Sequence, residues 1–162
     1  MLSRARTSTA ARVLVALVLV ALGVTACGDD GPTLTKTQFT KRAEAQCSHI
    51  PKARDALSAA QQATGAEVAS HVADAAAQLR RFGSAIGDLN APDALASSAD
   101  KLADAAQKYA DDLEELGKTT KAGQSFEDAQ RAHPKVVQKL NELIIDIDQL
   151  TIKLDLLDCL VA

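Results

Sequence analysis

The stretch that decides the fold is residues 66–89, which read AEVASHVADAAAQLRRFGSAIGDL. Apolar side chains recur in it at alternating steps of four and three residues, at Val68, Val72, Ala75, Leu79, Phe82, Ile86 and Leu89. That spacing is the heptad pattern of a helix that buries one seam against other helices. The stretch therefore predicts a long α-helix that packs alongside others.

The same template returns 27 residues later, after the turn sequence Asn90-Ala91-Pro92-Asp93. Its apolar positions are Leu95, Ala99, Leu102, Ala106, Tyr109, Leu113 and Leu116. A seven-residue seam makes unrelated helices look alike, so we interpret the similarity as coiled-coil-like packing rather than as duplication. Gly117 is expected to close this helix at its C-terminus.

Helix signals flank the two seams. Thr35 and Gln38 have the spacing of a capping box, and Leu34 and Phe39 occupy the hydrophobic-staple positions, so a helix should begin there. Pro51 should bend or interrupt that helix, which then continues to about Ala63. The stretch 64–67, TGAE, repeats the capping-box spacing before the first seam.

A last helical stripe begins after Ser125, which can act as a cap. Its members are Phe126, Ala129, His133, Val136, Leu140, Leu143, Ile147, Leu150, Leu154 and Leu157. We expect Pro134 to bend this helix, or to leave a separate short helix over 126–132. Short loops join the helices, so the sequence predicts an all-α protein, an antiparallel four-helix bundle with up-down-up-down topology.

Composition narrows the function. The 162 residues carry a net charge of −3 and only 2% aromatic residues, so we expect no nucleic-acid binding, which needs a basic surface and stacking platforms. The three histidines fall on different expected helices, at His49, His71 and His133. We interpret Glu67 and His71, one turn apart, as a solvated pair on the surface of their helix. We expect no metal, no cofactor and no catalytic residue, and hence not an enzyme, because no nucleophile elbow, phosphate loop or zinc motif occurs.

Carboxylates are plentiful but lie away from the heptad seams. They are Asp111, Asp112, Glu114 and Glu115 on one helix, and Asp146, Asp148, Asp155 and Asp158 on the last. Catalytic carboxylates would have to converge in a cleft with separated pKa values. We therefore interpret these eight as solvated polar faces.

The N-terminus has the layout of a signal peptide. Arg4, Arg6 and Arg12 precede an apolar run over 13–24, followed by small residues. The tetrapeptide 24–27, VTAC, resembles the lipobox of bacterial lipoproteins. The resemblance implies a signal peptide over residues 1–26, cleavage, and lipidation of Cys27, which would bind membrane lipid through two acyl chains.

Cleavage would divide the chain into a lipidated leash, residues 27–33, and a helical domain, residues 34–162. Removal of three arginines and no acidic residue would shift the net charge from −3 to −6. Cys47 and Cys159 would be left in a compartment where disulfides persist, so we expect them to pair. Free or metal-bound thiols are the alternatives.

The whole arrangement is similar to the small helical lipoproteins of high-GC Gram-positive, actinobacterial type. The similarity rests on the tetrapeptide at 24–27, on Phe39-x-x-x-Ala43-x-x-x-Cys47, and on Cys159 near the C-terminus. It implies a lipid-anchored location on the outer face of the cell membrane and a bridge between Cys47 and Cys159. It implies no particular activity.

Two functions from different classes remain. The first is a tethered helical interaction module that binds another protein of the cell envelope. The second is a carrier or sensor that holds a small apolar ligand between the helices, beside Phe82, Tyr109 and Val136, where alanine-rich seams could leave space.

Overall fold

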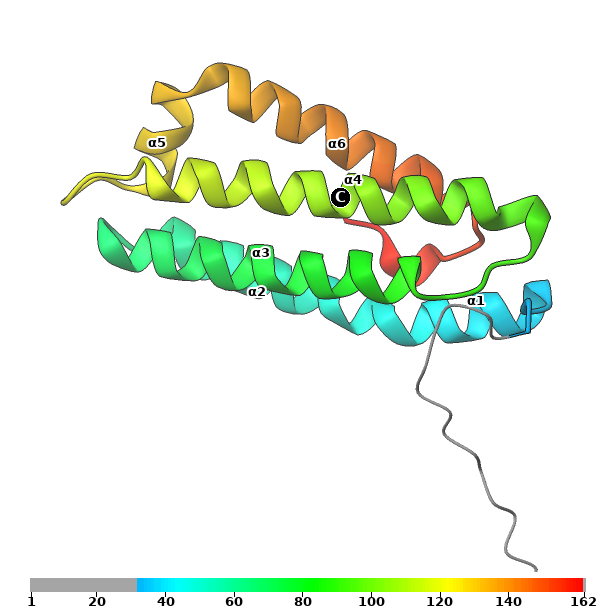
Figure 1. Cartoon of the computed structure of the whole chain (residues 1–162). Coiled ribbons are helices and arrows are strands. Elements are labelled where there is room, and N and C mark those ends of the chain that lie inside the picture. The colour runs from blue at the N-terminus through cyan, green and yellow to red at the C-terminus, as the bar shows by residue number, and fades with distance from the viewer. Residues whose placement is uncertain (1–31, 162) are drawn as a thin grey trace, which may run out of the picture. The chain divides into compact units, whose positions relative to one another are not determined.

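The computed structural model describes residues 32–161, which form helices joined by short loops (Figure 1). The elements are α1 (Lys36–Glu44), the 3-10 turn η1 (Ala45–Ser48), α2 (His49–Gln62), α3 (Ala66–Gly87), α4 (Asp93–Lys118), α5 (Phe126–Ala132), α6 (Pro134–Lys153) and the 3-10 turn η2 (Leu157–Cys159). The expected signal peptide, Cys27 and the leash up to Gly31 lie outside the described residues.

The long helices pack in chain order. Helix α2 packs on α3, α3 on α4, and α4 on α6. Figure 1 shows α6 along the side of α4 that faces away from α3. Across residues 32–161 the only β-type pairing is a single bridge between Thr64 and Ser125. The predicted all-helical architecture is confirmed.

Both predicted seams lie in the core. The α3 members Val68 to Ile86 and the α4 members Ala99 to Leu116 are buried, and only the flanking Leu89 and Leu95 are half-buried. Alanines fill much of the space between the seams, among them Ala75, Ala76, Ala99, Ala106 and Ala110. Small side chains let helices approach closely, which explains why so few aromatic residues are needed for a continuous core.

The first helix begins as predicted. Thr35 accepts a hydrogen bond from the Gln38 backbone, and the Gln38 side chain accepts one from the Thr35 backbone, which completes the capping box. Leu34 and Phe39 are both buried, and the Leu34 N–H donates to the Asn90 carbonyl at 2.9 Å. The start of the domain is thereby fixed to the turn between α3 and α4.

The predicted interruption near Pro51 occurs earlier in the chain. Pro51 lies in the first turn of α2, where a missing N–H costs nothing, and the 3-10 turn η1 precedes it. In an unbroken helix Pro51 would face the carbonyl of Cys47, four residues back, without a proton to donate. The helix therefore breaks at Ala45–Ser48 rather than at the proline itself.

The second predicted capping box is wrong. Gly65, not Thr64, is the N-cap of α3, and no side chain caps this helix. Thr64 instead bridges to Ser125, and the Gly65 N–H donates to the Gln124 carbonyl at 2.8 Å. The loop before α5 thus supplies the hydrogen-bond acceptor for the residue that begins α3. Gly65 has φ of 58°, a left-handed conformation that suits glycine.

The last stripe divides into two helices. Ser125 caps α5 through a capping box with Asp128, and α6 starts at Pro134, so the separate short helix over 126–132 is confirmed. Helix α6 ends at Lys153, however, four residues before the end of the predicted stripe. Asp155 adopts φ of 63°, which ends the helix and buries Leu154 and Leu156 together, while Leu157 is 60% exposed instead of buried.

The disulfide between Cys47 and Cys159 is confirmed, with their Cα atoms 4.6 Å apart. It joins η1, between α1 and α2, to η2, after α6. In the chain-entropy description a bridge across 112 residues stabilises the fold by about 4 to 5 kcal/mol.

Gly117 is not the C-terminal cap that we expected, because α4 continues to Lys118. It is a buried contact point. A Cβ atom at this position would lie 2.7 Å from Cγ1 and 2.9 Å from Cβ of Val72 on α3. The glycine is required by the close approach of α3 and α4, which local helix-capping rules do not capture.

Gly117→Ala should therefore destabilise the protein, by about 1–3 kcal/mol, because an extra methyl is forced into a packed contact. At an uncrowded position inside a helix, replacing glycine by alanine usually stabilises a protein by about 0.5–1 kcal/mol. Gly87→Ala is the matched control, since its Cβ would meet Ala103 Cβ at 3.4 Å, an ordinary contact. Urea unfolding measures the free energy of unfolding of both variants. Equal stability of the two glycine variants would contradict this assignment.

Candidate functional site

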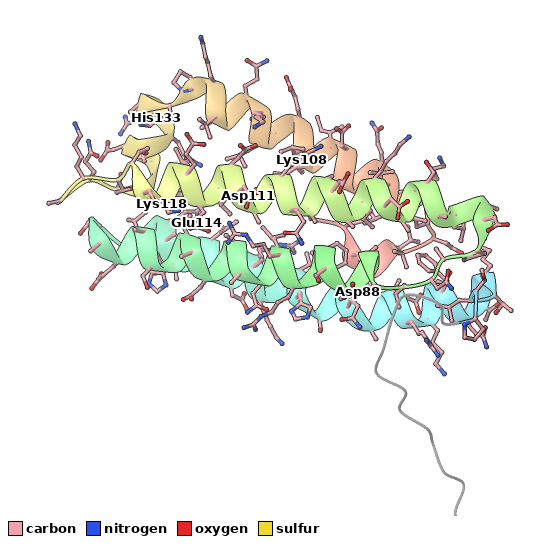
Figure 2. The ribbon with its side chains drawn as sticks, viewed as in Figure 1. Asp88, Lys108, Asp111, Glu114, Lys118 and His133 are labelled. Atoms are coloured by element: carbon pink, nitrogen blue, oxygen red, sulfur yellow. A yellow bond between two sulfur atoms is a disulfide. The ribbon has the colours of Figure 1, made fainter. Side chains whose placement is uncertain are left out.

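A groove runs between α4 and α6, with a volume of about 530 Å³. Its apolar floor comes from Ala105 on α4 and from Leu143 and Leu150 on α6. Its polar rim consists of Lys101, Asp104 and Lys108 on α4, and Asp146, Gln149 and Lys153 on α6. Figure 2 shows Lys108 on the side of α4 that faces α6.

The charges on the rim are free to engage another molecule. Three lysines stand against two aspartates, a local excess of positive charge on a chain whose net charge is −3. Within residues 32–161, none of these five side chains takes part in a hydrogen bond or an ion pair. The groove thus combines an apolar base with unpaired cationic ends, a composition suited to an amphipathic, acidic segment.

A second, smaller hollow lies between the helices and is partly open to solvent. It has a volume of about 140 Å³ and is lined by α2, α3, α4, α6 and the C-terminal segment, through Ile50, Ala53, Arg54, Leu57, Leu79, Tyr109, Ile144 and Val161. Nearly all of this surface is aliphatic. Of the residues predicted to border a cavity, Tyr109 lines it, whereas Phe82 and Val136 do not.

Residues 154–161, which we call the C-terminal strap, contribute Val161 to the lining of this hollow. Arg54 on α2 donates through Nη2 to the carbonyls of Leu160 and Val161, at 3.3 and 3.1 Å. The Val161 N–H donates to Oδ1 of Asp148 on α6, at 2.8 Å. Together with the Cys159 bridge to Cys47, these bonds tie α2 to α6 across the opening.

Several of the carboxylates hold the fold together. Arg80 on α3 pairs with Asp111 and Glu114 on α4, at 2.8 and 2.6 Å, and Figure 2 shows both carboxylates beside α3. The ion pair with Lys118 and then the bond from Arg80 lower the pKa of Glu114. Hydrogen bonds from the backbone and hydroxyl of Ser125 likewise lower the pKa of Asp128. These interactions fasten helices and caps rather than forming a catalytic pair.

Asp112 departs from the predicted solvated face. It is 8% exposed, and its Oδ1 accepts a bond of 2.7 Å from Lys139 Nζ on α6, which raises the pKa of Lys139. Its Oδ2 is buried without a hydrogen bond in the structure. The heptad pattern missed this residue because Asp112 stands just outside the α3-facing seam, where α6 covers it. The pair holds α6 to α4.

The histidines do not converge. His49 Nδ1 lies 2.9 Å from Oε1 of Gln78, a link between α2 and α3. His133 is half-buried and joins α5 to α6 through its backbone, as expected for a capping residue (Figure 2). His71 and Glu67 lie on α3. In the described part of the chain, no three histidine, cysteine or acidic side chains are grouped so that they could hold a metal ion.

Burial raises the pKa of Tyr109 to about 12, because the phenolate would lose its hydration inside the bundle. The unfolded chain ionises near pH 10, so the contribution of this group to stability is fully present below pH 10 and is lost as the pH rises toward 12. Tyr109 is the only tyrosine in a chain without tryptophan, so tyrosinate absorbance reports this residue alone. We expect the pH at which half of Tyr109 is ionised to be well above its value in the denatured chain. Coincident midpoints would show that water reaches the ring.

None of the helices within residues 32–161 is long and apolar enough to cross a membrane. Comparisons with known proteins found no family that matches the chain, and neither a curated protein nor a solved structure that is similar to it.

Proposed function

We propose that this protein is a lipoprotein tethered to the outer face of the cell membrane through Cys27, and that its helical domain is an interaction module of the cell envelope. The α4–α6 groove is the observation that carries the second part of the proposal. The partner that fits it is a protein segment with apolar side chains on one face and carboxylates on its edges.

Support for the tether comes from the sequence and from the disulfide. The basic N-terminus, the short apolar run and the tetrapeptide ending in Cys27 have the order required for lipidation. A bond between Cys47 and Cys159 suits a chain that folds outside the reducing cytosol. The described domain begins only a few residues after Cys27, so its N-terminal end would lie near the bilayer.

Support for the module comes from the chemistry of the groove. Leu143, Leu150 and Ala105 offer apolar contact, and Lys101, Lys108 and Lys153 offer charges that are not already paired. Elsewhere on α6, Ile145 and Ile152 are apolar side chains that are 56% and 58% exposed and stand one heptad apart. Interfaces of this kind combine an apolar centre with a charged rim.

The proposal includes an up-down-up-down arrangement of α2, α3, α4 and α6. It is supported by the packing of each of these helices on the next. In such an arrangement α4 and α6 are held side by side by Asp112 and Lys139, so the groove would be a permanent feature of the fold.

Photocrosslinking in intact cells tests the module. A photoreactive residue replaces Gln149, which is exposed and lines the groove, or Gln61, which is exposed on α2 and serves as the matched control. We expect one discrete protein adduct from position 149 and none from position 61. Lys101→Glu with Lys108→Glu should abolish the adduct, because reversed charges repel carboxylates on the partner.

Cys27→Ala tests the tether in the same experiment. This variant should lack the acyl chains and keep the signal peptide uncut, so its mass should differ from that of the lipidated protein by both changes. Equal adducts from both glutamine positions would contradict the groove as the docking surface. A Cys27→Ala product that stays in the membrane fraction with unchanged mass would contradict the tether.

A further inference from the structure

The residues that line the α4–α6 groove repeat at one spacing. Leu143 and Leu150, the two leucines of its floor, are one heptad apart, and so are Lys101 and Lys108 on the α4 edge. Seven residues of a helix advance about 10.5 Å along its axis. The groove therefore offers an apolar side chain and a lysine at one point, and both again about 10.5 Å further along.

An α-helix matches that repeat, whereas a β-strand does not. Side chains seven residues apart on a helix lie on one face at the same spacing of about 10.5 Å, which is how helices pack side by side. The side chains on one face of a strand recur about every 6.6 Å, so they would fall at about 6.6 and 13.2 Å and miss the second contact. The groove thus favours a helical occupant whose apolar residues are one heptad apart.

Helices α4 and α6 run in opposite directions along the groove, as the colours of Figure 1 show. The ion pair between Asp112, late in α4, and Lys139, early in α6, agrees with this arrangement. Lys101, near the start of α4, therefore lies toward the same end of the groove as Lys153, the last residue of α6.

The two ends of the groove consequently differ in charge. Lys101 and Lys153 give one end two positive charges, whereas Lys108 shares the other end with Asp146, and Asp104 lies between them on α4. Electrostatic complementarity fixes the register of an occupant more than it raises the affinity. An acidic occupant is therefore favoured in the direction that brings its carboxylates to the end with two lysines.

We propose that the partner presents an amphipathic α-helix to the groove, with apolar residues one heptad apart against Leu143 and Leu150 and with its acidic end at Lys101 and Lys153. This inference rests on the groove as the docking surface of the proposed interaction module, and it adds the backbone form and the direction of the occupant. The lining spans about 15 Å of α6, from Leu143 to Lys153, so about three turns of the partner helix are in contact. A free peptide of that length is barely helical in water, so the partner helix is part of a folded domain or forms on binding.

Photocrosslinking in intact cells from two positions tests the helix. A photoreactive residue replaces either Asp146 or Lys153, which are exposed, line the groove and stand one heptad apart on α6, and mass spectrometry identifies the partner residue joined to each. The two joined residues should be about seven apart in the sequence of a helical partner. They would be about three apart in an extended partner, because three extended residues span about 10 Å.

Charge variants test the direction, with the adduct from a photoreactive residue at Gln149 as the readout. Lys101→Gln with Lys153→Gln should lower the adduct yield about tenfold, through the loss of two exposed ion pairs. Lys108→Gln with Asp146→Asn is the matched control, because it removes one charge of each sign from the other end, and it should change the yield less than about twofold. All four side chains are exposed, so both double variants should fold.

The possible results separate this inference from the proposed function. Joined residues about three apart would overturn the helix, and equal yields from the two double variants would overturn its direction, while the groove would remain the docking surface. Adducts to a second copy of this chain or to lipid would overturn the partner helix altogether. No adduct from any position in the groove would overturn the interaction module and this inference together.

Discussion

The covalent bond between Cys47 and Cys159 is the constraint on which the position of the C-terminal strap and of the end of α6 depends. Among the long helices α6 packs on α4, while its link to α2 runs through the C-terminal strap. The bond holds the strap against η1, and Arg54 and Asp148 then fix its last residues. Without it, the strap would be attached to α2 only by exposed or partly buried hydrogen bonds, each of which adds little stability.

The fold divides into a tight half and a looser half. Helices α3 and α4 meet through alanines and glycines, so closely that a single methyl at Gly117 does not fit. Helix α6 meets α4 through larger side chains and the Lys139 pair with Asp112, and this spacing leaves a hollow on either side of α6. The groove and the second hollow both depend on where α6 lies, and its packing on α4, the pair of Lys139 with Asp112 and the disulfide together hold it there.

Much of this could be read from the sequence, because much of it is local. The two seams, the capping boxes of α1 and α5, and the helix start at Pro134 all follow from short-range patterns. The pairing of Gly65 with the loop before α5 and the packing of Gly117 on Val72 join distant segments, which no local pattern encodes. Of the three residues expected beside a cavity, Tyr109 lines the second hollow and Phe82 and Val136 do not. The groove depends on the relative position of α4 and α6 and was not predicted.

Hydrogen exchange of the oxidised and the reduced protein tests the role of the bridge most directly. With the bond intact, amides of the C-terminal strap and of the end of α6 should be protected. After reduction their protection should fall sharply, while α3 and α4 keep theirs because their alanine-rich contact does not involve the bridge. Unchanged protection in the strap, or an equal loss across all helices, would contradict the account.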